Sequence, residues 1–155
     1  MGRVIRSILA VIAGFVAASV IMMIVETANG KLLYPELGKR AEGVTDREEI
    51  KAIMAGAPVG ALVVVLVGRA LGSLAGEYLA TLISGNPPYG HALVLGALLT
   101  LAAVANNLML PPPLWFWIAT FAVFLPARFA GALLVPRRAA DGATPSATPG
   151  NPHPA

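Results

Sequence analysis

Cysteine is absent from the 155-residue chain, and charged side chains are scarce. Without cysteine, disulfides and thiolate metal sites are excluded. Charged residues make up 12% of the chain, whereas soluble domains carry roughly 25%. A water-soluble protein of this size could not cover its surface with so few charges. Because 57% of the residues are hydrophobic, we expect lipid to be the solvent for much of the surface.

The chain also lacks a strong charge imbalance, since its formal net charge is only +3. Its basic residues form no tract and accompany no aromatic-plus-basic module, so we expect no nucleic-acid partner. Instead, Arg3 and Arg6 stand at the start of the first apolar run, and Arg137 and Arg138 follow the last one. Lys and Arg in these positions are typical of helices anchored in a bilayer.

Four windows are long and apolar enough to cross a hydrocarbon core of about 30 Å, which takes roughly 20 helical residues. The first exceeds the apolar stretch of a secretory signal peptide, and we expect it to be retained. The sequence therefore predicts one all-α domain over residues 1–135, a membrane-embedded four-helix bundle, with spans at 4–25, 58–83, 92–110 and 114–135. The remaining residues, 136–155, are rich in Pro and Ala, and we expect this tail to be disordered.

The connections between the spans differ in length. The polar loop 29–57 holds a capping-box pattern in which Thr45 is the predicted N-cap and Glu48 its partner. This pattern predicts a short amphipathic helix lying on the membrane surface, after an irregular first half of the loop. The other two connections, near Gly85–Gly90 and Pro111–Pro113, are short, so spans two to four should be antiparallel neighbours.

Orientation is predicted from the positions of the basic residues. An even number of spans places both termini on one side of the membrane, and arginines crowd the N-terminal end of the first span. Because the first helix usually dominates the positive-inside rule, we expect a multi-pass protein of the bacterial inner membrane with both termini in the cytoplasm.

Small residues recur every four positions along the second span: Gly68, Gly72, Gly76, Ala80 and Ser84. Such a row lets two helix backbones approach closely in lipid. A shorter row, Ala10, Gly14 and Ala18, lies on the first span. Two interpretations are open. The long row can pack inside one bundle, or it can form the seam of a homo-oligomer or of a larger membrane complex.

Charged and amide side chains inside the spans are candidates for a functional site, because they are costly in hydrocarbon. Counting helical rise predicts that they gather at two levels. One cluster, near the long-loop end, comprises Glu26, Arg69, Asn106 and Asn107. The other, near the terminus end, pairs Glu77 with Arg128. These groups either are ion pairs that specify helix register or line a polar path or ligand pocket.

Several segments resemble those of small uncharacterised bacterial four-span membrane proteins: Leu32-Leu33-Tyr34-Pro35, Arg69-Ala70-Leu71-Gly72-Ser73-Leu74, Ala105-Asn106-Asn107-Leu108-Met109-Leu110-Pro111 and Trp115-Phe116. The resemblance runs from about residue 4 to residue 135. It implies the same topology and a bacterial inner-membrane location, and it carries no activity.

No catalytic, cofactor or metal motif accompanies the polar clusters, so the sequence predicts a protein that is not an enzyme and needs no cofactor. The leading hypothesis is a structural or accessory membrane module that packs into a larger assembly. The alternative is a small solute or ion transporter that uses the Glu26 cluster and dimerises through the row from Gly68 to Ser84.

Overall fold

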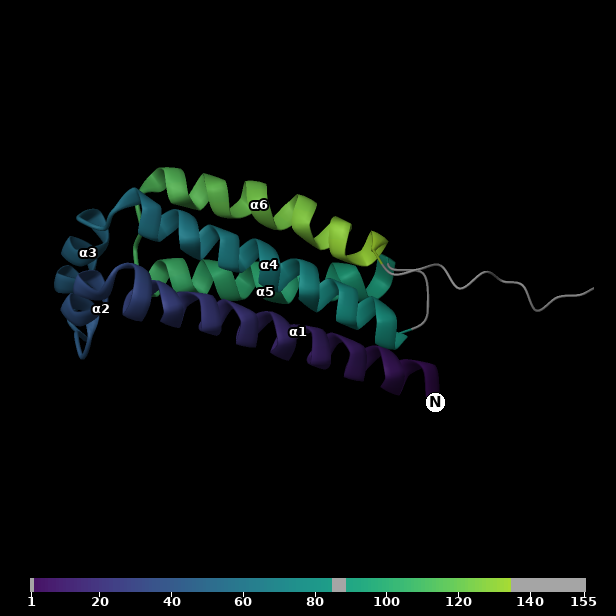
Figure 1. Cartoon of the computed structure of the whole chain (residues 1–155). Helices are drawn as coiled ribbons and strands as arrows, with labels where there is room; N and C mark the ends of the chain where they lie inside the picture. Colours follow the sequence, from purple (N-terminus) through teal and green to yellow (C-terminus); the bar gives the residue numbers. More distant parts are fainter. Residues whose placement is uncertain (1, 85–88, 135–155) are drawn as a thin grey trace, which may run out of the picture.

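A computed structural model describes residues 2–84 and 89–134, in which all regular structure is helical. Four long helices run side by side and two short ones lie at one end of them (Figure 1). The long helices are α1 (Gly2–Ala28), α4 (Val59–Ser84), α5 (Tyr89–Met109) and α6 (Leu114–Leu133). Between α1 and α4 come a π-helical turn, η1 (Asn29–Leu33), and the short helices α2 (Pro35–Ala41) and α3 (Arg47–Ala55). The predicted disordered tail, 136–155, lies outside the described residues.

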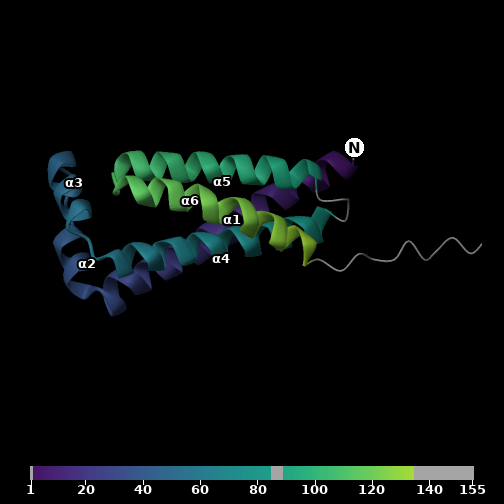
Figure 2. The same cartoon turned by 90° about the horizontal axis from the view of Figure 1, so that it is seen from above.

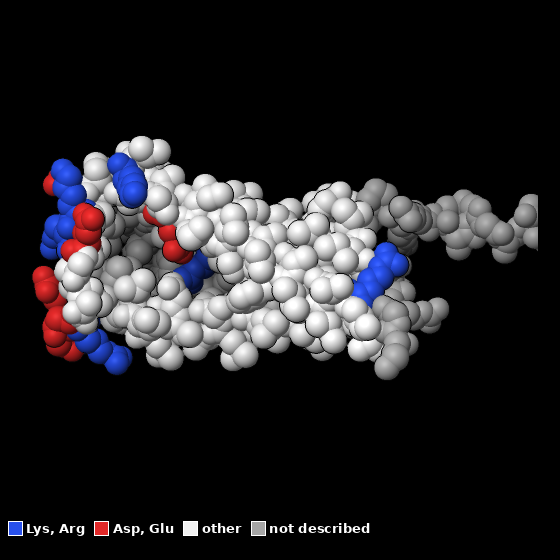
Figure 3. Space-filling view, turned by 90° about the horizontal axis from the view of Figure 1, so that it is seen from below, with Lys and Arg blue, Asp and Glu red and all other residues white. Residues whose placement is uncertain are grey.

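Three helices in the described residues are long and apolar enough to cross a membrane: Val4–Leu33, Val59–Ser84 and Leu114–Gly131. The apolar stretch of α5, Leu93–Met109, is shorter. The predicted all-α fold with long apolar helices is therefore confirmed, whereas a fourth span stays a prediction. The face shown in Figure 3 carries its charges mainly at the two ends, with an uncharged surface between them.

Helix α4 lies between α1 and α6 and also contacts α5. The row from Gly68 to Ser84 is buried, and it packs against α1. A Cβ atom added at Gly76 would lie 2.7 Å from the Gly14 carbonyl oxygen and 3.0 Å from the Ala18 Cβ. Only glycine permits this backbone approach. The row of small residues on α4 therefore packs against α1 of the same chain.

The terminus end of this helix pair is held by a basic side chain. Arg6, near the start of α1, donates a hydrogen bond from Nε to the carbonyl oxygen of Ile83 in the last turn of α4. A cation at this position satisfies one of the carbonyls that have no partner within the helix. It also joins the N-terminal end of α1 to the C-terminal end of α4, which are neighbours because the two helices are antiparallel.

The long loop differs from the sequence prediction in two respects. Its first half is helical rather than irregular, because Pro35 begins α2 and Gly38 lets that helix pack onto η1. An added Cβ at Gly38 would collide with the carbonyl of Gly30. The first helix also continues beyond Val25, to Ala28, and then into η1.

Helix α3 is the predicted amphipathic helix, but its N-cap is shifted by one residue. Asp46 rather than Thr45 caps it, accepting a hydrogen bond of 2.9 Å from the Glu49 backbone N–H. A carboxylate is an effective acceptor at this position, and it also favours the positive end of the helix dipole. The apolar face of α3 turns to the bundle, where Ile53 is buried and Met54 packs against the cluster formed by Leu62, Leu66 and Phe116.

Candidate functional site

A cavity of about 520 Å³ opens on the side of the bundle between α1 and α5, and its lining includes residues near the end that carries α2 and α3. We call it the lateral pocket. Figure 3 shows the hollow, with acidic and basic atoms inside it. Four helices supply the lining residues: Ser19, Met22, Met23, Glu26 and Thr27 from α1; Arg69 from α4; Leu99, Ala102, Ala103 and Asn106 from α5; Phe124 from α6.

The pocket exists because α1 and α5 diverge. The two helices are close at Gly14, where an added Cβ would lie 2.8 Å from the Leu95 side chain. From there they separate towards the α2 and α3 end (Figure 2). Along the same length α1 stays packed on α4, so the pocket opens on its α5 side.

Arg69 crosses the inner wall of the pocket and is 4% exposed. Its guanidinium donates one hydrogen bond of 2.9 Å to the Thr120 hydroxyl and another of 2.9 Å to the Asn107 side-chain carbonyl. The Arg69 Cζ also lies 5.0 Å from the centroid of the Phe116 ring. These contacts, from α5 and α6, orient the cation in one direction.

The free energy that the contacts of Arg69 contribute is comparable to the cost of burying its charge among the helices. An arginine at the centre of a span costs about 2.5–3.5 kcal/mol on the insertion scale. Each hydrogen bond from a charged donor returns about 1.5–3 kcal/mol, and the aromatic face adds about 0.5–2 kcal/mol. A guanidinium has five N–H groups. In the described part of the chain two of them are donated, which leaves others for a ligand.

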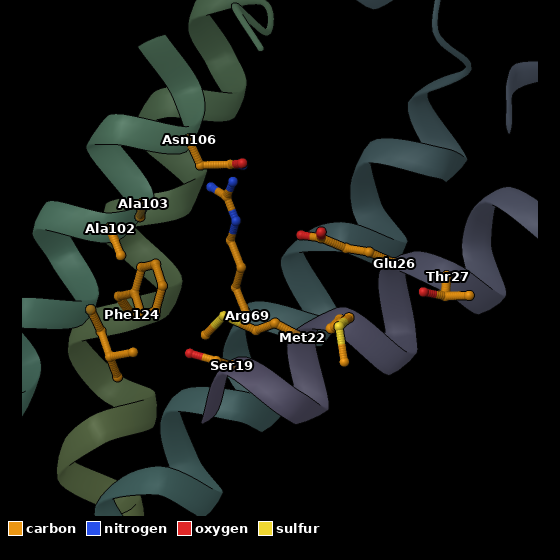
Figure 4. Close-up of a pocket in the computed structure, with 11 residues that line it drawn as sticks. Ser19, Met22, Glu26, Thr27, Arg69, Ala102, Ala103, Asn106 and Phe124 are labelled. Carbon is orange, nitrogen blue, oxygen red and sulfur yellow. The ribbon is translucent and has the colours of Figure 1, made fainter. Parts of the chain in front are cut away.

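Glu26 lies on the opposite wall of the pocket and does not directly neutralise Arg69. Its carboxylate points across the pocket towards the Arg69 side chain (Figure 4), and the two charges interact electrostatically. Among the described residues, however, no ion pair joins Glu26 to a basic group. The predicted cluster of Glu26, Arg69, Asn106 and Asn107 is thus arranged around the pocket. Counting helical rise gives the level of each residue and could not predict this cavity.

The two neighbouring asparagines have different positions. Asn107 is 2% exposed and binds Arg69 directly, while its side-chain NH₂ has no hydrogen-bond partner in the described residues. Asn106 lines the pocket, with its amide directed at the end of the Arg69 side chain (Figure 4). Asn107 therefore orients the cation, whereas Asn106 is available to a ligand.

Of the second predicted polar pair, Glu77 and Arg128, the structure describes the side chain of Glu77. Glu77 is 0% exposed and Ser73 is 1% exposed, so both lie inside the bundle on the same face of α4 as Arg69. The side chain of Arg128 lies outside the described residues, and its predicted pairing with Glu77 stays a prediction.

Sequence reasoning missed two contacts of Arg69, Thr120 and Phe116. The available signal was their spacing. Phe116, Thr120 and Phe124 are four residues apart, so they share one face of α6. A single hydroxyl between two aromatic rings on a buried helix face indicates a polar partner on a neighbouring helix. All three residues are buried.

The polar groups that line the lateral pocket are few. Its residues offer one carboxylate, one guanidinium, one amide and two hydroxyls, beside an apolar floor. The Ser19 hydroxyl donates to the Phe15 carbonyl at 2.9 Å, and the lining holds no histidine that could activate it. Within the described residues no group of His, Asp or Glu is placed to hold a metal ion.

Comparisons of the chain with protein-family models, curated proteins and solved structures give no significant match.

Proposed function

We propose that the chain is a non-enzymatic, four-span membrane protein that binds a small ligand in the lateral pocket. The observation that carries this proposal is the Arg69 guanidinium at the pocket wall, held by Asn107 and Thr120 and facing an acid that does not contact it. A preorganised cation with undonated N–H groups is a binding element for an anionic group. The proposal thus keeps the non-enzymatic membrane module expected from the sequence and adds ligand binding to it.

We favour this proposal over the alternative of a transporter that dimerises through the row from Gly68 to Ser84. That row is covered by α1, and a second copy could reach it only by displacing this helix. The exposed large apolar residues lie on the outer faces of all four long helices, α4 included, where lipid can cover them.

Membrane insertion with four spans can be tested by labelling, because the natural chain has no cysteine. A cysteine replacing Glu42 should react with an impermeant thiol reagent outside intact cells. A cysteine replacing Ala155 should react only after permeabilisation. If both cysteines react from the same side, α5 does not cross the membrane, and the four-span topology is wrong.

Ligand binding can be tested by filling the pocket. Ala102 is exposed and lines the pocket, whereas Ala97 on the same helix is exposed and does not line it. Each is replaced by Phe, and the proteins are reconstituted in nanodiscs of mixed phosphatidylethanolamine and phosphatidylglycerol. Native mass spectrometry then counts the lipids that each protein retains.

The wild-type protein and Ala97→Phe should keep one lipid at a collision energy at which Ala102→Phe keeps none. Retention of one lipid by all three proteins at that collision energy would overturn the proposed function.

A further inference from the structure

The arrangement of charge and apolar surface in the lateral pocket identifies a ligand class. We propose that the pocket binds the headgroup of a zwitterionic lipid, with the lipid phosphate on Arg69 and its ammonium on Glu26, and with an acyl chain along the apolar floor. This inference rests on the proposed function, since it assigns the ligand of that same pocket.

The charges of the pocket select a zwitterion over a simple anion. Arg69 offers a cation with undonated N–H groups, but the carboxylate of Glu26 faces it across the cavity. An anion bound to Arg69 would therefore be repelled by Glu26. A zwitterionic headgroup is complementary to both walls, because its anionic end can bind Arg69 while its cationic end binds Glu26. The Asn106 amide, directed at the end of the Arg69 side chain, can bond the same headgroup.

The depth of the polar groups matches a lipid headgroup. Asn106 is three residues from the Met109 end of α5, and Glu26 is two residues from Ala28, where α1 passes into the π-helical turn η1. With a rise of about 1.5 Å per residue, both lie within about 5 Å of these two positions. Arg69 starts deeper, but its side chain reaches Asn107 at the same level. The polar part of the pocket is therefore near the end of the bundle that carries α2 and α3, where the headgroup of a lipid lying along the helices would be.

The apolar part of the pocket lies deeper, where an acyl chain would be. Leu99 is ten residues from the Met109 end of α5, and Phe124 is ten residues from the Leu114 start of α6. Both are thus about 15 Å from the same end of the bundle. Met22 and Met23 of α1 complete this floor, and methionine adapts to chains of variable shape. The pocket also opens sideways, which is the direction from which a lipid would enter.

The test compares headgroups in nanodiscs that hold equal amounts of phosphatidylethanolamine and phosphatidylglycerol, read by native mass spectrometry. The wild-type protein should retain phosphatidylethanolamine about tenfold over phosphatidylglycerol. Glu26→Gln should abolish or reverse that preference, because it removes the repulsion of the anionic headgroup. The matched control is Glu42→Gln, at an exposed acid on the C-cap of α2, and it should behave as wild type.

The outcomes separate this inference from the proposed function. If Ala102→Phe abolishes lipid retention but Glu26→Gln leaves the preference unchanged, the zwitterion assignment is overturned and the pocket remains a lipid site. If Ala102→Phe retains the lipid as the wild type does, the pocket itself is overturned.

A water-borne zwitterion is the other source of the same chemistry. Phosphoethanolamine added at millimolar concentration should leave the thermal midpoint of the wild-type protein unchanged. If it instead raises the midpoint of the wild type and not of Glu26→Gln, while no lipid is retained, the lipid source is wrong.

Discussion

Helix α1 meets its two neighbours in opposite ways. On the α4 side its backbone is in contact with another backbone, at Gly14 against Gly76, and no side chain separates them. On the α5 side it touches Leu95 near Gly14 and then diverges, leaving the lateral pocket. The difference follows from side-chain size and polarity. Small residues let α1 and α4 approach closely. Beside α5, in contrast, Glu26 and Arg69 lie on opposite walls of the pocket without forming an ion pair.

The close interface between α1 and α4 stabilises the fold, whereas the lateral pocket between α1 and α5 is available to a ligand. The α4 side of α1 contains the buried residues Ala10 and Ala18, both 0% exposed. The α5 side contains Glu26 and Thr27, which the surrounding helices leave exposed. Substitutions that insert or remove volume on each side of α1 should therefore differ in their effect on the free energy of unfolding in detergent.

The largest effect is expected from Gly76→Leu. A Cβ alone would lie 2.7 Å from the Gly14 carbonyl oxygen, so a leucine must force α1 and α4 apart. We expect a loss of about 3 kcal/mol or more, measured by denaturant titration in micelles. Gly30→Ala is the control, because its Cβ would meet nothing closer than 3.7 Å. Similar midpoints for the two variants would contradict a close α1–α4 interface.

A smaller loss is expected from Leu95→Ala, where α1 and α5 still touch. Leu95 is 0% exposed, and removing it leaves a cavity that costs about 2–5 kcal/mol. Leu99→Ala should cost less, since Leu99 already adjoins the lateral pocket. Leu101→Ala, at a residue 66% exposed, serves as the control. If Leu99→Ala destabilised more than Leu95→Ala, α1 and α5 would have to be closed at the pocket.

Arg69→Lys should lower stability by about 1–3 kcal/mol, because an ammonium cannot bond Asn107 and Thr120 in the geometry of the planar guanidinium. The thermal midpoint in detergent measures this loss. Arg40→Lys, at an exposed position in α2, should leave the midpoint unchanged. Equal midpoints for the two variants would mean that the contacts of Arg69 contribute nothing to the fold.

The smallest effect on stability is expected from Ala102→Phe, which adds a ring to the open side. The pocket has room for it, so the free energy of unfolding should change by no more than about 0.5 kcal/mol. The same ring should nevertheless abolish ligand retention. A loss as large as that of Gly76→Leu would show that the two sides of α1 are equally close-packed.

Sequence reasoning located the polar groups along the helices better than across them. Helical rise gives the level of Glu26 and Arg69, but no rule gives the distance between α1 and α5 at that level. The asparagines illustrate the same limit. Asn106 and Asn107 are neighbours in the chain, yet only packing decides that Asn107 turns inward to Arg69 and Asn106 turns to the pocket.

Local patterns succeeded where one helix face decides the outcome. The four-residue spacing from Gly68 to Ser84 indicates a single face, and the five residues are buried together. The pattern around Thr45 correctly indicated a helix start, but two adjacent capping residues compete there, and Asp46 makes the bond. The helical first half of the loop was missed because Gly38 is unfavourable in an isolated helix, and its contact with Gly30 is tertiary.

An experimental structure in nanodiscs containing phosphatidylethanolamine tests the central claim most directly. We predict that α1 and α5 stand apart beside Arg69, with a headgroup bound between this guanidinium and the Glu26 carboxylate. A closed pocket, in which Glu26 and Arg69 form a direct ion pair with no ligand between them, would contradict the account.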